Sequence, residues 1–395
     1  MLQIPVYLDN ASTTPCDPRV VEVMLPYFTH HFGNASSRSH QFGWKAEAAV
    51  ETARKSVAAL IGANPGEIIF TSGSTEGCSL ALRGVYESYS LKGNHIITTA
   101  TEHKAVLDTC KALQKKGAEV TFLNTGMDGV LDVDVLKAAI RPQTILIAVM
   151  YANNETGVVQ PVKEIGCIAK EHDILFFSDA TQAIGKIPVN VEEDGIDILA
   201  LSAHKMYGPK GTGALYLRRK APRVKLVPQI TGGGQQNNVR SGTLNVPGIA
   251  GLGKACEICS IEMQKEGERL GTLRDELQNR LLQIEESYLN GRIDKRLPNI
   301  CNISFRSLAS SQLLSVLNKK LAVSSGSACT SGSLDPSYVL KAMGIEDGLA
   351  RGSIRFSLGR FTTKEEIDFA VDEVIKAVGE LRDESFEWEL FTKNK

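Results

Sequence analysis

The sequence predicts an α/β fold, in which helices flank a mostly parallel sheet, followed by a smaller α+β domain. Short apolar runs rich in β-branched and aromatic residues alternate with stretches of helical periodicity, as in sheets joined by crossover helices. This rhythm changes near residue 255, and 395 residues are more than one ordinary core requires. We therefore expect a large domain over residues 16–255 and a small one formed by residues 1–15 and 256–395.

Seven apolar runs are predicted to be the strands of one sheet. They are Ile68–Thr71, Ile96–Thr99, Val120–Leu123, Ile145–Val149, Ile174–Phe177, Ile198–Leu201 and Gly213–Leu217. Helical patterns fall between them, for example at Glu47–Leu60 and Leu107–Lys116. Because an open α/β sheet binds its ligands at the ends of its strands, polar residues that follow these runs are the first candidates for function.

Two amphipathic helices are predicted after residue 255. Glu257–Glu286 carries an apolar stripe formed by Leu270, Leu273, Leu277, Leu281 and Ile284. Thr363–Asp383 begins with a capping box in which Thr363 and Glu366 take part. Its apolar face is expected to contain Ile367, Ala370, Val371, Val374, Ile375 and Val378.

Composition and charge exclude several classes of protein. A hydrophobic content of 43% and a charged content of 23% fit a soluble globular protein. The net charge of −1 indicates neither a nucleic acid nor a membrane surface as an electrostatic partner. We see no signal peptide or membrane span, and the eight scattered cysteines favour a reducing cytoplasm. Cys256 and Cys259 have no second cysteine pair or histidine near them, so no metal site is expected.

Lys205 is the most informative candidate. It follows the apolar run that ends at Ser202 and precedes a Gly/Pro turn. A buried lysine loses its proton more readily, and a neutral amine can form a Schiff base with an aldehyde cofactor. Asp179 follows another apolar run and can face a pyridinium nitrogen. A lysine and an aspartate of this kind are what pyridoxal phosphate requires, although a lone strand-end lysine is more often solvent-exposed.

Three further strand ends carry polar residues, and each has a structural alternative. Phe70–Gly77 leads from a strand into a helix start, where backbone amides and Thr75 can hold a phosphate, but Ser/Thr caps also occur without ligands. His103 can stack on a planar cofactor or transfer protons, or it can be structural. Asn154 can orient a ring or a substrate carboxylate, or it can belong to a turn.

The fourth strand end is Asp179–Gln182. If a helix begins there, Asp179 and Gln182 can face one ligand, whereas the alternative is an aspartate N-cap. Farther along the chain, Arg240 and Thr243 lie in a glycine-rich segment and can bind anions, or that segment is a surface loop. Arg355 is a candidate for holding an α-carboxylate, and a surface ion pair is its alternative.

Cys329 stands in Ser324–Ser333, a segment in which seven of the ten residues are Gly or Ser. Such a segment is expected to be mobile and exposed, unlike the apolar setting of an inert buried cysteine. A thiol there can move between a buried site and a partner. We therefore expect Cys329 to be functional, with an incidental loop cysteine as the alternative.

Taken together, these segments resemble the cysteine desulfurase family, and within it the iron–sulfur-assembly branch of the fold-type I pyridoxal phosphate enzymes. The resemblance runs from Tyr7–Pro15 to the helix that ends near Asp383. Its most specific parts are Ala100–Thr109, Ser202–Gly211 and Ser324–Ser333. A chance match to all three in order is very improbable.

The resemblance implies a role for each candidate. Lys205 would form the Schiff base and then act as an acid/base, Asp179 would pair with the pyridinium nitrogen, and Gln182 would bond the ring hydroxyl oxygen. His103 would stack on the ring and help in proton transfer. The phosphate would be held by Thr75, Ser202, His204 and, from the neighbouring subunit of a homodimer, Thr243. Asn154 would also contact the cofactor, and the substrate carboxylate would be held by Asn154, Arg355 and Asn34. Cys329 would be the nucleophile.

The implied reaction converts L-cysteine to L-alanine and leaves a persulfide on Cys329. The sulfur would go to an iron–sulfur scaffold protein, with tRNA thiolation as a second destination. Selenocysteine lyase stays open because selenium and sulfur require similar geometry, whereas an aminotransferase has no need for Cys329. A non-catalytic binding module is disfavoured by the joint presence of Lys205, Asp179, His103 and Cys329. A role mainly as an assembly subunit also stays open.

Overall fold

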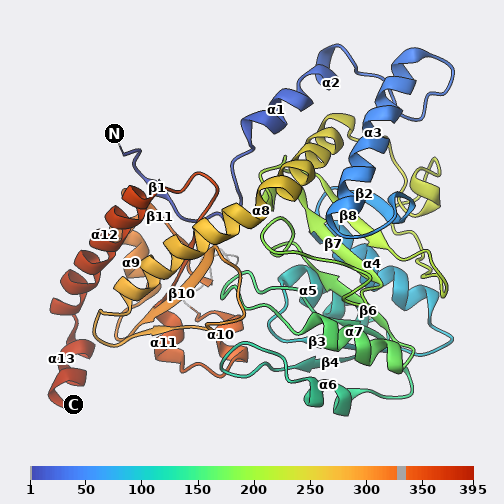
Figure 1. The fold of residues 1–395 in the computed structure, drawn as a ribbon. Helices are drawn as coiled ribbons and strands as arrows, with labels where there is room; N and C mark the ends of the chain where they lie inside the picture. The colour runs from blue at the N-terminus through green and yellow to red at the C-terminus, as the bar shows by residue number, and fades with distance from the viewer. Residues whose placement is uncertain (1, 327–334) are drawn as a thin grey trace.

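The computed structural model describes residues 2–326 and 335–395 (Figure 1). All seven predicted strands form one sheet, in the order β2-β8-β7-β6-β5-β3-β4. Their bounds are β2 Ile68–Thr71, β3 His95–Thr99, β4 Glu119–Leu123, β5 Thr144–Ala148, β6 Leu175–Asp179, β7 Ile198–Ser202 and β8 Gly213–Leu217. Strand β8 is antiparallel to both of its neighbours, and the other adjacent pairs are parallel. The predicted mostly parallel sheet is confirmed.

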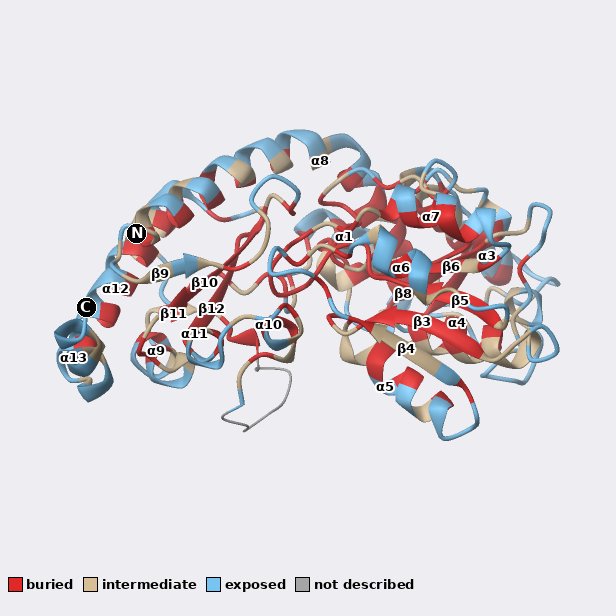
Figure 2. Ribbon diagram, turned by 90° about the horizontal axis from the view of Figure 1, so that it is seen from below, coloured by how far each residue is buried: buried red, intermediate tan, exposed pale blue. Residues whose placement is uncertain are grey.

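Helices cover both faces of this sheet (Figures 1 and 2). Because successive side chains of a strand point to opposite faces, Phe176 enters one core and Phe177 the other. Helices α3, α6, α7 and the first half of α8 pack in the first core, and α4 and α5 in the second. The helices up to this point are α1 Pro18–Met24, α2 Pro26–Thr29, α3 Gln41–Leu60, α4 Ser74–Ser88, α5 Lys104–Gln114, α6 Val133–Ala139, α7 Val162–Glu171 and α8 Val246–Leu281.

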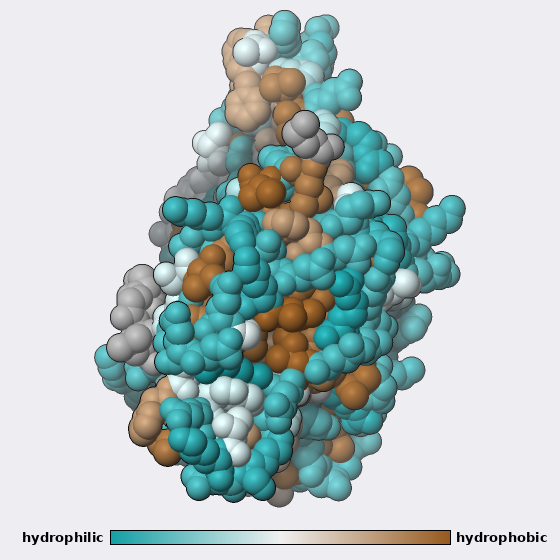
Figure 3. Space-filling view, turned by 90° about the vertical axis from the view of Figure 1, so that its left-hand side faces the viewer, coloured by the Kyte–Doolittle hydropathy of each residue, from teal (hydrophilic) through white to brown (hydrophobic). Residues whose placement is uncertain are grey.

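A third core lies in the C-terminal part, where the second half of α8 packs on a sheet of order β12-β10-β9. The start of the chain belongs here too, since β1 pairs with β11. The strands are β1 Val6–Tyr7, β9 Ser287–Leu289, β10 Ile300–Phe305, β11 Leu321–Ala322 and β12 Ser353–Ser357. The helices are α9 Ser310–Leu317, α10 Tyr338–Ala342, α11 Asp347–Arg351, α12 Lys364–Asp383 and α13 Phe386–Lys393. Figure 3 views the molecule from this side, where hydrophilic residues cover most of the surface.

Both predicted C-terminal helices exist, with two corrections. The capping box of α12 is confirmed, because the Thr363 hydroxyl accepts from the amide of Glu366 and the Glu366 carboxylate accepts from that of Thr363. The prediction for Ile375 was wrong: this side chain is exposed, because it lies beside the stripe that packs on the core rather than within it.

The second correction concerns α8, which spans Val246–Leu281 rather than Glu257–Glu286, so Ile284 lies beyond its end. Glycine has a low helix propensity, so the glycines in the first turns of α8 disfavour a helix in the sequence, but their packing explains why they occur there. A Cβ on Gly253 would lie 2.6 Å from the Cα of Ala53 in α3, so glycine lets the two helices approach closely. Residue 255 therefore falls inside a continuous helix, and the exact division into domains stays a prediction.

Within residues 2–326 and 335–395, no helix is long and apolar enough to cross a membrane. The cytoplasmic location expected from the cysteine content stays a prediction.

Two glycine substitutions should have opposite effects on stability. Gly253→Ala should destabilise the protein by roughly 1–3 kcal/mol, because the new methyl group meets the α3 backbone. Gly379→Ala in α12 should stabilise it by up to about 1 kcal/mol, since a Cβ there meets nothing within 4 Å. Thermal unfolding midpoints measure both changes. An unchanged midpoint for Gly253→Ala would contradict the packing described.

Candidate active site

A cavity of about 610 Å³ lies where β2, β5, β6 and β7 end, a size suited to a small ligand. Because these strands are parallel, their carboxyl ends meet at the same edge of the sheet. Most of the predicted site residues line this cavity. They are Thr75, His103, Asn154, Asp179, Gln182, Ser202, His204, Lys205 and Arg355.

Three predicted residues are not brought to this cavity by the described structure. Asn34 is exposed in the segment between α2 and α3, where its side-chain oxygen accepts from the amide of Ser36. Thr243 is exposed in the loop before α8. Cys329 lies outside the described residues. The roles expected for these three stay predictions.

Lys205 emerges directly after β7, in a short 3₁₀ turn formed by Ala203–Lys205. Its Nζ atom donates to the carbonyl oxygens of Ala11 and Ser12, at 2.6 and 2.5 Å. The backbone of Ala11, Ser12 and Thr13 therefore forms one wall of the cavity. Sequence reasoning gave these residues no role, although the run of small polar residues at this point was a signal.

Asp179 ends β6, and its carboxylate is held from several sides. Oδ1 accepts from the Ser74 hydroxyl at 3.1 Å and from the amide of Thr181 at 3.0 Å. Oδ2 accepts from the Cys78 thiol at 3.6 Å. A turn follows instead of a helix, and it brings Gln182 to the cavity wall, where Nε2 donates to the Ala11 carbonyl at 3.0 Å. Asp179 thus holds the turn and lines the cavity at the same time.

The start of α4 forms a cradle for an anion. The helix begins at Ser74 after Gly73, whose φ of 152° suits glycine, and none of the described side chains caps it. Uncapped amides and the helix dipole both favour a negative group, and Thr75, Ser202 and His204 line the same cavity. Burial, together with Lys205 and Lys210, lowers the pKa of His204 to about 4, so the ring is neutral at pH 7.

His103 is the N-cap of α5, and its Nδ1 accepts from the amide of Ala105 at 3.1 Å. Because Nδ1 accepts, the proton of the neutral ring sits on Nε2. The structural alternative is confirmed, and because the capping ring also lines the cavity, the functional role of His103 stays a prediction.

Arg355 reaches the cavity from β12, on the C-terminal part of the fold. Its guanidinium donates to the Asn154 carbonyl and to Asp9, each at 2.8 Å. The Nε atom of Arg355 and Oδ1 of Asn154 are buried and have no hydrogen-bond partner among the described residues. Buried polar atoms without partners are rare, so both are open to a ligand. The ion pair with Asp9 was not expected from the sequence.

Arg240 was a candidate anion binder, but its Nε atom lies 2.8 Å from Glu76 in α4. A second contact, at 3.2 Å, joins Nη2 to the same carboxylate. Glu76 thus neutralises this arginine beside the cavity, which disfavours the anion-binding role.

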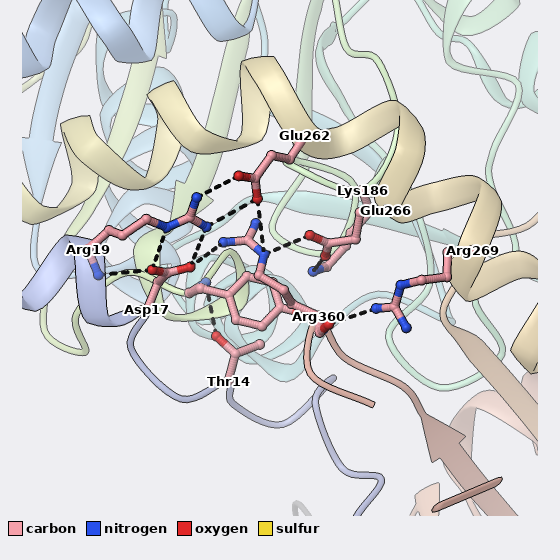
Figure 4. A network of polar contacts seen from close by, with 9 residues as sticks. Thr14, Asp17, Arg19, Lys186, Glu262, Glu266, Arg269 and Arg360 are labelled. Atoms are coloured by element: carbon pink, nitrogen blue, oxygen red, sulfur yellow. Dashed lines mark hydrogen bonds and ion pairs between the residues drawn. The ribbon is translucent and has the colours of Figure 1, made fainter. Parts of the chain in front are cut away.

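A partly buried network of ion pairs joins three segments that are distant in the sequence (Figure 4). Arg360, just after β12, forms ion pairs at 2.7 Å with Asp17 and with Glu266 of α8. Arg19 extends the network by pairing with Asp17 and with Glu262, at 2.8 and 2.5 Å. The bond from Arg19 and the bond from Arg360 hold the pKa of Asp17 well below its usual range.

Tyr207 connects this network to the lysine turn. Its ring is fully buried, with the Arg360 guanidinium 4.2 Å from its centre and Lys186 Nζ 4.4 Å from it. The cation–π attraction between these two cations and the tyrosine ring is strong in a site without water. The Tyr207 amide donates to the Thr14 hydroxyl at 2.9 Å. The φ of 64° at Tyr207 is therefore fixed from several sides, two residues beyond Lys205.

Comparison with known proteins identifies the family. A family model described as Aminotransferase class-V matches residues 6–369. The chain belongs to this family. Among its curated relatives is the cysteine desulfurase IscS of Pectobacterium carotovorum subsp. carotovorum (strain PC1), 53% identical over 392 residues, which cover 99% of this chain and 96% of the relative.

Solved structures of the same family superimpose closely on the chain. One described as a NifS-like protein has a TM-score of 0.89 at 36% identity, and the match covers 95% of this chain and 100% of that one. Another, SspA in complex with cysteine, has a TM-score of 0.79 at 37% identity and covers 90% and 99%. Class-V aminotransferases and cysteine desulfurases depend on pyridoxal phosphate.

The cavity fits this cofactor. The uncapped start of α4 suits its phosphate, and the carboxylate of Asp179 suits its ring nitrogen. Lys205 brings to the cavity a primary amine, the group that suits its aldehyde. The unpartnered oxygen of Asn154 is a further polar atom that a ligand in the cavity can satisfy.

Glu102 is a buried carboxyl beside the cavity that sequence reasoning missed. Its Oε1 accepts from the amide of Met150 at 2.6 Å and from the Thr99 hydroxyl at 3.0 Å, whereas Oε2 is buried and has no hydrogen-bond partner in the part of the chain that the structure describes. Burial is the main cause that raises the pKa of Glu102 to about 8. The group is therefore mostly uncharged at pH 7.

Glu102→Gln should change how stability depends on pH. Folding raises the pKa of Glu102 from 4.5 to about 8. The protonated carboxyl therefore makes its full contribution to stability below about pH 4.5, and this contribution is lost as the pH rises to about 8. The unfolding free energy of the variant minus that of the unaltered protein should thus be about 3 kcal/mol larger at pH 8 than at pH 5, because the variant has no carboxyl that ionises between these pH values. Urea unfolding at both pH values measures it, with the exposed Glu47→Gln as control. Equal differences at both pH values would contradict the neutral carboxyl.

Proposed function

We propose that the chain is a pyridoxal phosphate-dependent cysteine desulfurase. It takes sulfur from L-cysteine, releases L-alanine and leaves a persulfide on Cys329. The observation that carries this proposal is the convergence of Lys205, Asp179 and Arg355 on one cavity, in a chain 53% identical to a cysteine desulfurase. The description of a similar structure in complex with cysteine supports the substrate.

Bound in the cavity, pyridoxal phosphate supplies an electron sink that lets the Cα–H bond of an amino acid break. Lys205 holds it covalently through Nζ and, once free, moves a proton at the substrate Cα. Asp179 holds the proton on the ring nitrogen. Gln182 and Asn154 contact the ring, and Thr75, Ser202 and His204 bind the phosphate. A neutral His204 can do so as a hydrogen-bond donor without adding charge.

The substrate carboxylate is bound by Arg355 and Asn154, with Asn34 as a further contact. Arg355 is already oriented by Asp9 and the Asn154 carbonyl, so little side-chain freedom is lost on binding. His103 lies on another wall of the cavity and carries its proton on Nε2, from which it can be transferred.

In the sulfur step, one sulfur atom passes from the substrate cysteine to the thiol of Cys329. The Cys329 thiolate attacks the substrate sulfur, so an S–S bond forms as the substrate C–S bond breaks. The electron pair of the C–S bond stays on the substrate carbon. That carbon takes up a proton, and the product is released as alanine. The persulfide then passes to an acceptor, which we propose to be an iron–sulfur scaffold protein, with tRNA thiolation as a second destination.

We also propose a homodimer. The N-terminal helices expose large apolar side chains that a monomer would leave in water: Leu25, Phe28, Phe32, Phe42 and Trp44. Patches of this kind mark protein interfaces, and a second copy of the chain is their expected occupant. Thr243 is also exposed, as a residue must be if it reaches the phosphate in the neighbouring subunit.

Replacing both Phe28 and Phe32 by Asp should convert the dimer to a monomer, because buried carboxylates without partners are costly. Sedimentation velocity should show twice the chain mass of 42.8 kDa for the unaltered protein and a single chain mass for the variant. Leu91→Asp, at a fully exposed position elsewhere, should leave the dimer intact. A dimer that persists in the double variant would place the interface elsewhere.

Lys205→Ala should abolish the visible absorbance of the lysine-linked cofactor, because no other amine is proposed to bind the aldehyde. Lys210→Ala, which removes another lysine of the same cavity, should retain that absorbance. Absorbance spectra of the proteins purified with added cofactor are compared. An unchanged spectrum of Lys205→Ala would overturn the assignment of the lysine.

Cys329→Ser should keep the cofactor but lower sulfide release from L-cysteine at least about a hundredfold, since a hydroxyl is a poor acceptor of sulfur. In the unaltered protein, mass spectrometry should find alanine and an adduct of about 32 Da, one sulfur atom, on the Cys329 peptide. Cys167→Ser, at an exposed cysteine in α7, should behave like the unaltered protein. Full sulfide production by Cys329→Ser would exclude it as the nucleophile.

A further inference from the structure

Glu76 is a carboxylate within the anion cradle itself. It is the third residue of α4, and its side chain lines the cavity together with Ser72 and Thr75. Its Oε2 atom accepts from the amide of Ser72 at 2.8 Å, two residues before the helix begins. The carboxylate therefore holds the backbone that leads into the cradle. A negative charge at this point repels an anion unless a cation offsets it.

Arg240 supplies that cation. Its Nε atom donates to Oε1 of Glu76 at 2.8 Å, and its Nη2 atom donates to Oε2 at 3.2 Å. An arginine that holds a carboxylate through two nitrogens fixes the orientation of the carboxylate as well as offsetting its charge. Burial would raise the pKa of Glu76, but the bonds from Arg240 and Ser72 outweigh it and hold this pKa below its usual value. Glu76 is therefore charged at pH 7, and its charge is paired.

The loop that carries Arg240 is fastened to the strand before the cradle. The side chain of Gln236 accepts from the amide of Phe70 and donates to the carbonyl of Phe70, each at 2.7 Å. Because β2 is an edge strand, this side-chain amide takes the place of a further strand. Gln236 and the two residues that follow it have φ between 51° and 61°, a conformation that residues other than glycine keep only where contacts enforce it. The loop thus holds Arg240 against α4.

We propose that Glu76 is a positioning residue for the phosphate of the cofactor. Its bond to the Ser72 amide fixes the approach to α4, and Arg240 keeps the carboxylate in place and offsets its charge. The first turn of a helix has amides without partners in the helix, and they bind an anion best when the backbone before them is already fixed. This inference rests on the proposed function, because it takes the anion to be the phosphate of pyridoxal phosphate.

Two ligands that differ by one phosphate group test this role. The full chain is stripped of cofactor and titrated with pyridoxal phosphate and with pyridoxal, which has the same ring and aldehyde. The visible absorbance of the lysine-linked ligand reports binding. Glu76→Ala removes the carboxylate, whereas Glu76→Gln keeps its size and can still accept from Ser72. Glu164→Ala is the control, because Glu164 is exposed as the third residue of α7 and is not among the described residues that line the cavity.

Glu76→Ala should bind pyridoxal phosphate roughly fivefold to tenfold more weakly and bind pyridoxal as tightly as the unaltered protein does. Glu76→Gln should lose about twofold to threefold for pyridoxal phosphate, because a neutral oxygen accepts less strongly than a carboxylate. The control should match the unaltered protein with both ligands. In the cofactor-free protein, amide hydrogen exchange should become faster in Glu76→Ala over residues 72–75 and stay unchanged in α7.

Unchanged or tighter binding of pyridoxal phosphate by Glu76→Ala would overturn the inference. Tighter binding would mean that the lost carboxylate had kept Arg240 from binding the phosphate itself. Equal weakening with both ligands would also contradict it, since Glu76 would then act on the ring or on the fold, and so would unchanged exchange over residues 72–75. Should Glu76→Ala fail to fold, pyridoxal phosphate binding by Glu76→Gln that is unchanged or tighter decides against the inference.

The titration of the unaltered protein tests the function on which the inference rests. No binding of pyridoxal phosphate would overturn both the proposed function and the role of Glu76. Tight binding without formation of alanine from L-cysteine would overturn the desulfurase reaction alone. Tight binding that Glu76→Ala leaves unchanged would overturn the role of Glu76 alone.

Discussion

The guanidinium of Arg360 is the point on which the geometry of the site depends. Burying it without partners would cost several kcal/mol, and Asp17 and Glu266 offset that cost with close ion pairs. Removing it would leave Asp17 with Arg19 as its ion-pair partner and Glu266 with Lys186, whose Nζ lies 3.8 Å away. Arg355 lies in β12, which ends shortly before Arg360, and Tyr207, whose ring Arg360 contacts, follows Lys205 closely. One ion-pair network therefore helps to fix the distance between Arg355 and Lys205, the groups proposed to bind the substrate carboxylate and the cofactor.

The cavity combines groups from separate parts of the fold. The strand ends of the large sheet contribute Lys205, Asp179 and the cradle at α4, whereas Arg355 comes from β12. The protonation states are set by burial, since His204 and Glu102 are neutral at pH 7 for that reason. The lysines and Arg355 thus give the cavity a positive character, which suits both a phosphate and a carboxylate.

The strands and the lining of the cavity could be predicted because each depends on local pattern. Apolar runs defined all seven strands of the large sheet, and polar residues after them defined Lys205, Asp179 and His103. Contacts between segments far apart in the sequence could not be predicted in this way. The pair of Arg355 with Asp9, the wall formed by Ala11–Thr13 and the buried Glu102 all depend on tertiary packing. The start of α8 was missed for the same reason, because the glycines in its first turns are required by close packing against α3.

Helix α8 runs without a break through both the large core and the C-terminal one. Its 36 residues make a rod about 54 Å long. A flexible loop would let the two cores swing freely, but here any change in their mutual angle has to bend the rod or shear the side chains packed along it. The stiffness of this single helix therefore resists opening and closing of the cavity. It keeps the residues that the two cores contribute to the cavity at a constant distance from one another.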